Sequence, residues 1–534
     1  MDELEVTLVA LLLGIAVLSA AARAINVPYP IVLVLGGALL SFAPGLQEIR
    51  LDPDLVLLLF LPPLLYSGAF FANLRELRTA ARPIALLAIG LVLVTMLVVA
   101  VVAHELVDGM SWAAAFTLGA IVGPTDPVAA TAIARRLGVP RRLVSVLEGE
   151  ALVNDATALV AYRIAITAAT SVVAFSILDA AWDFLWKAAG GIAVGLVVGW
   201  IVAQVRKRLN DPLIENTISL LTAYAAYVPA ELLHVSAVLA AVTVGCYVGW
   251  MAPQISSPTT RLMGFGMWEL LQFLLNAFLF ILIGLQLPAV LDALEGTSPA
   301  TLLGWAAAVS AAVVICRLVW QWLIVYPIRW LGATRLLTTR GRSRWQERTV
   351  VGWAGMRGAV SLAAALALPT DFPFRDEILF LTFAVIFVTL VLQGLTLSPL
   401  IRMFGVLDDG SEEEREELTA RLYATQAALG RLEELGGEDW ARDDTLERLR
   451  NMYEYRRRRL KARAGKIEDD GFEDRSTQYQ TVVRELLEAQ RREIVRLRNE
   501  GTISNDVMHR IERELDLEDE RLEFRPGERS PQAR

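Results

Sequence analysis

Thirteen apolar runs dominate about the first 400 residues of this chain. The hydrocarbon core of a bilayer is about 30 Å thick, and a helix needs about 20 residues to cross it. Backbone groups in lipid must hydrogen-bond within their own segment, which favours helices. The sequence therefore predicts an all-α polytopic membrane protein with about 13 transmembrane helices and excludes an ordinary globular enzyme. The runs lie near 4–22, 29–46, 54–71, 83–107, 111–136, 143–169, 185–205, 213–233, 237–252, 262–291, 299–326, 346–368 and 377–401.

The basic residues of the connecting loops predict how the chain is oriented. If the runs alternate in direction, 18 Lys and Arg residues fall in loops on one side, against Arg50, Lys187 and Arg375 on the other. Cytoplasmic loops of membrane proteins carry the excess of basic residues. We therefore expect a multi-pass protein of the inner (plasma) membrane, in contact with lipid, with its N-terminus outside and its C-terminal tail in the cytoplasm.

The tail differs from the rest of the chain in composition. Residues 405–534 contain 33 acidic and 25 basic residues, which accounts for the whole net charge of −8. Charge pairs at i,i+4 spacing, such as Glu417 with Arg421, predict helices. We thus expect a transmembrane domain at 1–404 and a cytoplasmic helical domain at 405–534. No Walker loop, dinucleotide fingerprint or metal-ligand spacing occurs in the tail, and we expect neither a cofactor nor a nucleic-acid partner.

The fifth apolar run contains two prolines near its middle. Pro124 and Pro127 enclose Thr125 and Asp126. Each proline lacks a backbone donor and disfavours helical geometry in the residue before it. A simple proline kink is the alternative, but a kink does not need a carboxylate between its prolines. The pattern predicts an unwound segment that lines a cavity within the membrane.

The sixth run carries charges at membrane depth. Asp155 lies about 12 residues from its cytoplasmic end, or about 18 Å at 1.5 Å per residue, which is near the bilayer midplane. Asn154 beside it offers an amide oxygen, and Glu150 lies one turn earlier. An ionisable residue within a span costs about 2.5–3.5 kcal/mol on insertion scales, and such residues mark ion pathways.

A second break is predicted in the twelfth run, where Gly352, Gly355 and Gly358 surround Arg357. Close packing of unbroken helices would also use glycines. If runs 1–6 and 8–13 are inverted repeats, however, both breaks fall in the fifth helix of each half. Crossed discontinuous helices at matching positions are typical of secondary transporters with a midplane ion site.

Five motifs, in this order, resemble the monovalent cation:proton antiporter-1 family of sodium/proton exchangers. The resemblance covers about residues 5–404 and implies an NhaA-like antiporter fold, with a six-helix core of crossed, broken helices and a separate dimerisation domain, and hence a homodimer. The motifs are FLPPLLYSGAF (60–70), GPTDPVAA (123–130), EGEALVNDA (148–156), WELLQFLLNAFLFILIGLQL (268–287) and GMRGAVSLAAAL (355–366).

The resemblance also assigns site residues. It implies a cation- and proton-binding site at Asp155, Asn154, Asp126 and Thr125, with Asp155 and Asp126 as the sodium ligands. It further implies a structural ion pair between Glu150 and an arginine. The resemblance places this arginine in the eleventh run, which here is Arg317. Depth in the membrane agrees with that pairing, and Arg357 is the second choice.

Two positions depart from the family pattern. Many members carry an acidic residue where this chain has Ser67, and a serine is common where it has Ala151. Both changes remove possible cation ligands, so the resemblance leaves the ion preference open.

The expected function is therefore antiport of sodium, or lithium, against protons by alternating access, with a role in pH homeostasis. The two ions would compete for Asp155. One titrating Asp beside an Asn favours one proton per sodium ion and an electroneutral cycle. Potassium/proton exchange is the nearest alternative, and a gated cation channel is a third. An embedded enzyme is disfavoured, because His104 and His234 lie at the outer ends of spans, far in depth from Asp155.

Overall fold

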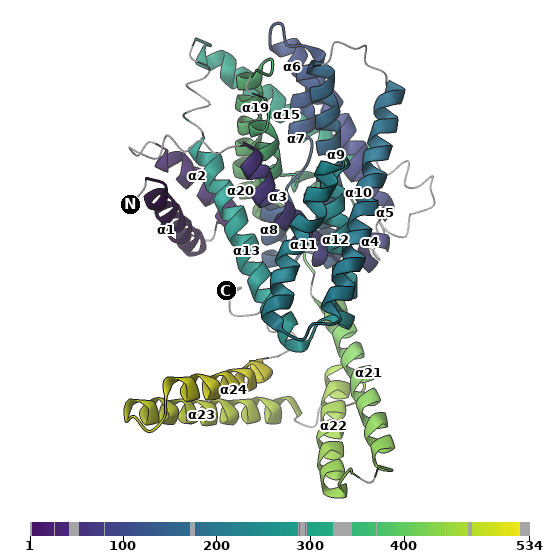
Figure 1. The fold of residues 1–534 in the computed structure, drawn as a ribbon, viewed down its shortest axis with the longest axis vertical. Helices are drawn as coiled ribbons and strands as arrows, with labels where there is room; N and C mark the ends of the chain where they lie inside the picture. The colour runs from purple at the N-terminus through teal and green to yellow at the C-terminus, as the bar shows by residue number, and fades with distance from the viewer. Residues whose placement is uncertain are drawn as a thin grey trace. The chain divides into compact units, whose positions relative to one another are not determined.

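The computed structural model describes residues 3–25, 27–41, 53–79, 81–170, 177–286, 288, 294, 296–323, 344–369, 371–408, 410–438, 440–467 and 472–523. Every regular element in these ranges is helical (Figure 1). The chain divides into two compact units, Met1–Leu407 and Asp408–Arg534. The all-α prediction is confirmed.

The helices of the first unit follow the predicted apolar runs. Among the described residues, eight helical stretches are long and apolar enough to cross a membrane, and three shorter apolar helices accompany them. The remaining two runs form α11 and the broken pair α17–α18, which contain more polar residues. In chain order the elements are α1 (Glu3–Ala24), α2 (Tyr29–Leu40), α3 (Pro53–Phe70), α4 (Leu74–Thr79), α5 (Ala81–Ala85), the π-helical η1 (Leu86–Leu91), α6 (Val92–Leu106), α7 (Trp112–Val122), α8 (Pro127–Leu137), α9 (Arg141–Thr170), α10 (Ile177–Arg206), α11 (Pro212–Leu232), α12 (Ala237–Ile255), α13 (Pro258–Leu285), α15 (Pro299–Leu323), α17 (Arg344–Trp353), α18 (Ala359–Leu366), α19 (Arg375–Val388), the π-helical η3 (Thr389–Gln393) and α20 (Gly394–Phe404).

Local sequence signals set several helix ends. Asp211 and Ser257 are the N-caps of α11 and α13, and each is followed by a proline at the first helical position. Their side chains accept hydrogen bonds from backbone N–H groups that have no partner within the helix. Gly138 ends α8 in the left-handed conformation, which glycine adopts without strain.

The first unit consists of two packed groups of helices, which we call lobe A and lobe B. Lobe A contains α1–α3 and α10–α13, and its most extensive contacts are those of α13 with α2 and of α12 with α10 and α3. Lobe B contains α4–α9, α15 and α17–α20, in which α7 packs against α6 and α9. Gly284 allows α13 to approach α2 closely, because a Cβ atom there would collide with the backbone at Val34.

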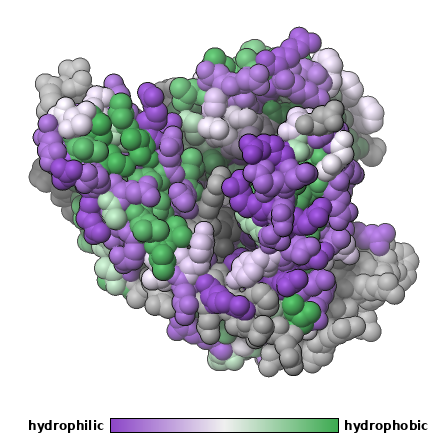
Figure 2. Space-filling model, turned by 90° about the horizontal axis from the view of Figure 1, so that it is seen from below, coloured by the Kyte–Doolittle hydropathy of each residue, from purple (hydrophilic) through white to green (hydrophobic). Residues whose placement is uncertain are grey.

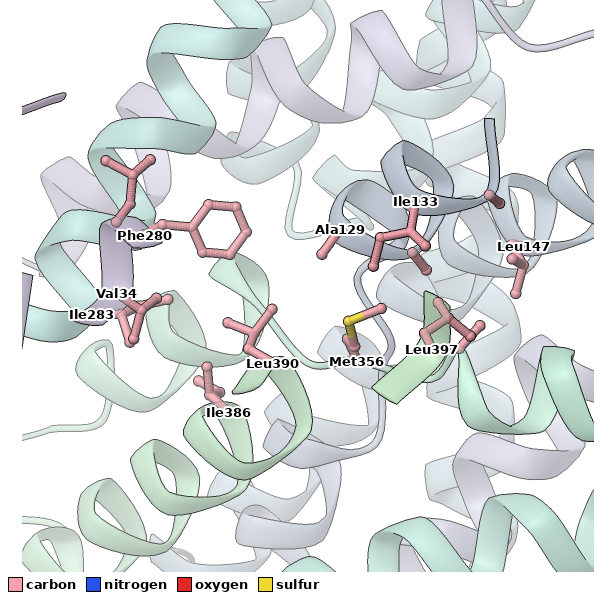
Figure 3. Packing of buried hydrophobic residues seen from close by; sticks show 14 of the residues in the cluster. Val34, Ala129, Ile133, Leu147, Phe280, Ile283, Met356, Ile386, Leu390 and Leu397 are labelled. Carbon is pink, nitrogen blue, oxygen red and sulfur yellow. The ribbon is translucent and has the colours of Figure 1, made fainter. Parts of the chain in front are cut away.

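A buried apolar cluster holds the two lobes together. Val34, Phe280 and Ile283 of lobe A pack in one cluster with Ile386 and Leu390 of lobe B (Figure 3). The same cluster continues around Met356, which is fully buried and lies between Leu390 and Leu397 in Figure 3. The packing of the Met356 side chain in this cluster thus holds the segment between α17 and α18 in place.

Apolar side chains are exposed along several helices of the first unit. Trp186, Leu196 and Trp200 of α10 are each more than two-fifths exposed, as are Ile315 and Trp322 of α15. Such surfaces match the lipid-facing sides of transmembrane helices. The view from below shows extensive hydrophilic surface with hydrophobic residues gathered in separate patches (Figure 2).

The second unit contains two helical hairpins. Helix α21 (Ser411–Leu435) packs against α22 (Asp443–Arg463), and α23 (Phe472–Asn499) packs against α24 (Asn505–Glu523). Leu487 and Ile494 of α23 bury their side chains against Met508 and Leu515 of α24. Arg491 bridges the same two helices through Asp516, at 2.8 Å, and Asp519, at 3.1 Å. The predicted pair Glu417–Arg421 forms within α21 at 2.6 Å.

Candidate functional site

Both predicted breaks are present, and the two unwound segments are hydrogen-bonded to each other. Residues 123–126 separate α7 from α8, and residues 354–358 separate α17 from α18. The backbone N–H of Asp126 donates to the carbonyl oxygen of Met356 at 2.8 Å. The prolines and glycines therefore open two helices at one crossing point and leave backbone groups available there.

The Asp126 carboxylate lies at the N-terminal end of one half-helix and near that of another. Its Oδ1 accepts the N–H of Val128 at 2.9 Å, which makes Asp126 the N-cap of α8. A Cβ atom at Gly358, the residue before α18, would collide with the same carboxylate. A negative charge in this position is favoured by the positive ends of both helix dipoles.

Arg357 occupies the opposite dipole ends. It is fully buried, and its Nε donates at 3.1 Å to the carbonyl oxygen of Val122, the last residue of α7. Its Nη1 donates to the carbonyl oxygen of Gly355, just after α17, and its backbone N–H donates to Oγ1 of Thr389 at 3.1 Å. The guanidinium thus satisfies the C-terminal carbonyl groups that the breaks expose. Within the described ranges, no carboxylate lies at ion-pair distance from it.

Glu150 pairs with Arg317 rather than with Arg357. Nη1 of Arg317 donates to Oε1 of Glu150, and Nη2 donates to Oε2 at 3.0 Å. The two side chains are 1% and 0% exposed. Arg317 also donates to the carbonyl oxygens of Gly352, at 3.2 Å, and Val351, at 3.3 Å. The pair therefore joins α9 and α15 to the C-terminal end of α17.

Thr125 connects this ion pair to Asn154. Its Oγ1 donates to Oε1 of Glu150 at 3.1 Å and accepts from Nδ2 of Asn154 at 2.9 Å. Asn154 is 1% exposed, yet its carbonyl oxygen Oδ1 has no hydrogen-bond partner. A buried acceptor without a donor costs free energy. This acceptor belongs to the residue directly before Asp155.

A cavity of about 780 Å³ lies between the two lobes and reaches Asp155. Lobe A contributes residues of α2, α3 and α13, and lobe B contributes α8, α9, α18 and the first break. Among the described residues, the Asp155 carboxylate makes no hydrogen bond or ion pair. Thr125, Asp126 and Ala151 line the same cavity. Four other residues of interest do not line it: Asn154, Glu150, Arg317 and Arg357. The predicted site residues are therefore brought together as one lining group and one buried supporting group.

The lobe A wall of this cavity was missing from the site predicted from sequence. Ser67 of α3 accepts a hydrogen bond from Nε2 of Gln272 at 2.8 Å and donates to the carbonyl oxygen of Leu64 at 3.1 Å. Glu269, Gln272 and Asn276 of α13 line the cavity as well. Their spacing of three, four and seven residues places them on one helix face, which the motif at 268–287 contains and which could have revealed them.

The sequence reasoning also missed a second buried ion pair in lobe A. Arg206 and Glu215 approach to 3.8 Å and are 3% and 1% exposed. Arg206 donates to Ser256, and Thr260 donates to Glu215. This cluster joins α10 and α11 to the C-terminal end of α12 and the first turn of α13, and it lies apart from the cavity lining.

Comparisons with known proteins agree with this arrangement. Residues 8–403 match the family model described as sodium/hydrogen exchanger, transmembrane. An uncharacterised Na⁺/H⁺ exchanger of Mycobacterium tuberculosis is 34% identical over 530 residues, covering 97% of this chain and 96% of that protein. The Na⁺/H⁺ antiporter ApNhaP of Aphanothece halophytica is 34% identical over 423 residues, covering 79% of this chain and 78% of the antiporter.

A solved structure shares the fold. The sodium proton antiporter MjNhaP1 of Methanocaldococcus jannaschii superimposes with a TM-score of 0.58 at 18% identity. The match covers 75% of this chain and 99% of that one. The broken-helix architecture described above is thus the fold of a known membrane transporter.

Proposed function

Since this chain belongs to the sodium/hydrogen exchanger family, we propose that it exchanges sodium ions for protons by alternating access, with both ions competing for Asp155. Family membership makes it a multi-pass cation/proton antiporter rather than an enzyme. The identity of the cation, the stoichiometry and the binding residues are the parts that we propose.

The observation that carries the proposal is the Asp155 carboxylate, which has no partner among the described residues although it faces a cavity between two lobes. Glu150 is already neutralised by Arg317, and Asp126 already accepts the N–H of Val128 as the N-cap of α8. A carboxylate in a membrane protein needs a proton or a cation to offset its charge. Asp155 is therefore the group that can exchange one for the other.

Oxygen atoms around Asp155 suit a small hard cation, which prefers oxygen ligands. Thr125 and Asp126 line the cavity with it. Asn154, the residue before Asp155, holds the buried Oδ1 that has no hydrogen-bond partner. We propose that Asp155 and Asp126 provide the charged oxygens and that Thr125 and Asn154 provide neutral ones.

Two features support an inward-open state. The cavity lining includes Arg135, in the last turn of α8, and Glu148, in the N-terminal part of α9. The loop between these helices belongs to the basic side assigned to the cytoplasm. The cavity also separates the lobes at the broken helices, where many transporters rock one group of helices against the other. We propose that lobe B, which contains Asp155, moves against lobe A to expose the site to the other side.

The proposed cycle is electroneutral, because the residue beside Asp155 is Asn154, which carries no charge. A carboxylate at that position would add a second titrating group. One proton then replaces one sodium ion on Asp155, and the membrane potential does no net work on the cycle. The proposal retains a homodimer, an N-terminus outside the cell and a cytoplasmic tail, as the sequence predicts.

Potassium/proton exchange is the second candidate, and one observation favours it. The Ser67 hydroxyl already accepts from Gln272 and donates to Leu64, and Ala151 has no polar group. Neither Ser67 nor Ala151 therefore supplies an extra oxygen ligand. Sodium binds its hydration water more tightly than potassium does, so it needs more protein ligands to replace that water. A site with few protein oxygens would discriminate less strongly against the larger ion.

The experiment is cation-driven proton flux in vesicles that contain the purified protein, with sodium, lithium and potassium supplied in turn. Asp155→Asn should abolish flux for each active cation, because it keeps the side-chain shape and removes the charge. Asp108→Asn is the matched control, since Asp108 is an exposed carboxylate in the turn after α6 and does not line the cavity. Exchange by Asp155→Asn at the level of the control would overturn the proposal.

A further inference from the structure

One charged side chain in the cavity is not used by the proposed cycle. Glu269 lies on α13, in lobe A, and faces the cavity from the wall opposite the α8–α9 side. It is exposed, and within the described ranges it makes no hydrogen bond or ion pair. A carboxylate without a partner attracts cations to the space that it faces.

The orientation of Glu269 is fixed by its neighbour. Trp268 is 1% exposed, and its Nε1 donates to Oγ of Ser219 on α11 at 3.2 Å. The same Ser219 hydroxyl lies 3.3 Å from the Tyr66 hydroxyl of α3. Because successive helical residues point about 100° apart, anchoring Trp268 inside lobe A keeps Glu269 on the face that lines the cavity.

The other charges along the cavity leave an excess of negative charge. Arg135 is the sole basic residue among the described lining residues, and Glu148 pairs with it at 2.5 Å. Asp126 caps α8 and Asp155 is the proposed exchange group. Glu269 is therefore a carboxylate in the cavity that neither caps a helix, nor pairs with a base, nor belongs to the proposed binding site.

Its position in the fold separates Glu269 from the moving part of the site. Helix α13 packs mainly against α2, α11 and α3, all in lobe A, whereas α9, which carries Asp155, packs against α7, α8 and η1 in lobe B. When lobe B moves, Asp155 leaves the cavity that Glu269 faces. The charge of Glu269 then acts on the ion site in one of the two access states only.

We propose that Glu269 is a positioning residue that concentrates cations in the cytoplasmic cavity and thereby sets the apparent KM for the cation on that face alone. This inference rests on the proposed exchange at Asp155. It adds that the apparent KM for the cation depends on Glu269 at one membrane face and not at the other. Glu269 attracts the cation without holding it through the lobe movement, so the maximal rate does not depend on it.

The test measures sodium-dependent proton flux from each face, in inside-out and right-side-out membrane vesicles. Glu269→Gln should raise the apparent KM for sodium at the cytoplasmic face by about threefold, the size expected for one charge in a wet cavity. The maximal rate and the KM at the other face should stay at wild-type values. Raising the ionic strength with choline chloride should shrink the difference, because salt screens the attraction.

Three further variants distinguish electrostatic attraction from a packing defect. Glu269→Asp keeps the charge and should behave as wild type. Phe265→Glu added to Glu269→Gln returns a carboxylate one turn away on the same cavity-lining face and should restore most of the cytoplasmic KM. Glu105→Gln, at an exposed and unpaired acid of α6 outside the cavity, should change neither KM.

The outcomes separate this inference from the proposed function. An equal KM change on both faces, no change on either, or loss of the maximal rate in Glu269→Gln at normal membrane abundance would overturn the role of Glu269. Absence of cation-driven proton flux in the wild type, or retained flux in Asp155→Asn, would instead overturn the exchange mechanism itself.

Discussion

Removal of the Arg317 side chain should destabilise the membrane unit strongly, because it leaves the Glu150 carboxylate buried without its counter-charge. Glu150 is 1% exposed, and Thr125 would be its one remaining hydrogen-bond donor among the described residues. Breaking a buried ion pair from one side costs about 3–5 kcal/mol. The carbonyl groups of Val351 and Gly352 would also lose their charged donor.

This cost converts into a measurable change in thermal stability. Large domains lose about 2 °C of melting temperature per kcal/mol, so Arg317→Ala should melt about 6–10 °C below the wild type. The assay is loss of the monodisperse peak of detergent-purified protein after heating, which needs no transport activity. Glu150→Gln combined with Arg317→Met should recover most of the loss, since a buried pair replaced on both sides by uncharged groups is often neutral.

The exposed pair Arg163–Glu231 provides the matched control. Its charged atoms approach to 2.8 Å, but both side chains are 45% exposed. Exposed pairs contribute about 0–1 kcal/mol, so Arg163→Ala should shift the melting temperature by about 2 °C or less. Equal shifts for Arg317→Ala and Arg163→Ala would refute the reasoning from burial. Rescue of Arg357→Ala, and not of Arg317→Ala, by Glu150→Gln would show that the wrong arginine has been assigned.

Two further predictions concern voltage and the tail. Asn154→Asp should make transport sensitive to an imposed potassium diffusion potential in the presence of valinomycin, because it adds a charge beside Asp155. Proton flux of this variant that is indifferent to the potential would contradict the assignment of Asn154 as the residue that keeps the cycle electroneutral. Truncation after Leu407, where the second unit begins, should preserve exchange and shift the pH at which it starts, since a separate unit acts by biasing one access state. Loss of all flux from a well-inserted truncated protein would make the tail part of the transport machinery.

Features that depend on local sequence were predictable from the chain alone. The apolar runs, the break at Pro124 and Pro127, and the break around Gly355 are consequences of hydropathy and backbone geometry within a few residues. The approximate depth of Asp155 follows from the rise per residue along one helix. These inferences needed no knowledge of which helices are neighbours.

Features that depend on pairs distant in sequence were decided by tertiary packing. Glu150 and Arg317 are separated by 167 positions, and depth along two helices ranks the possible partners without fixing how each helix is rotated. Asp126 looked like a simple cation ligand in the sequence, yet its carboxylate also caps α8 and fills the space beside Gly358.

The cavity wall formed by α3 and α13 is the clearest case of this division. The helical face with Glu269, Gln272 and Asn276 is present in the sequence, but its meaning depends on what lies opposite. Hydrogen bonds within a helix are local and so follow from the residues themselves, whereas the space between two lobes depends on how every intervening helix packs. The sequence by itself determined the helices, their breaks and the approximate depth of Asp155; the tertiary structure alone decided which charges are neutralised and which face the cavity.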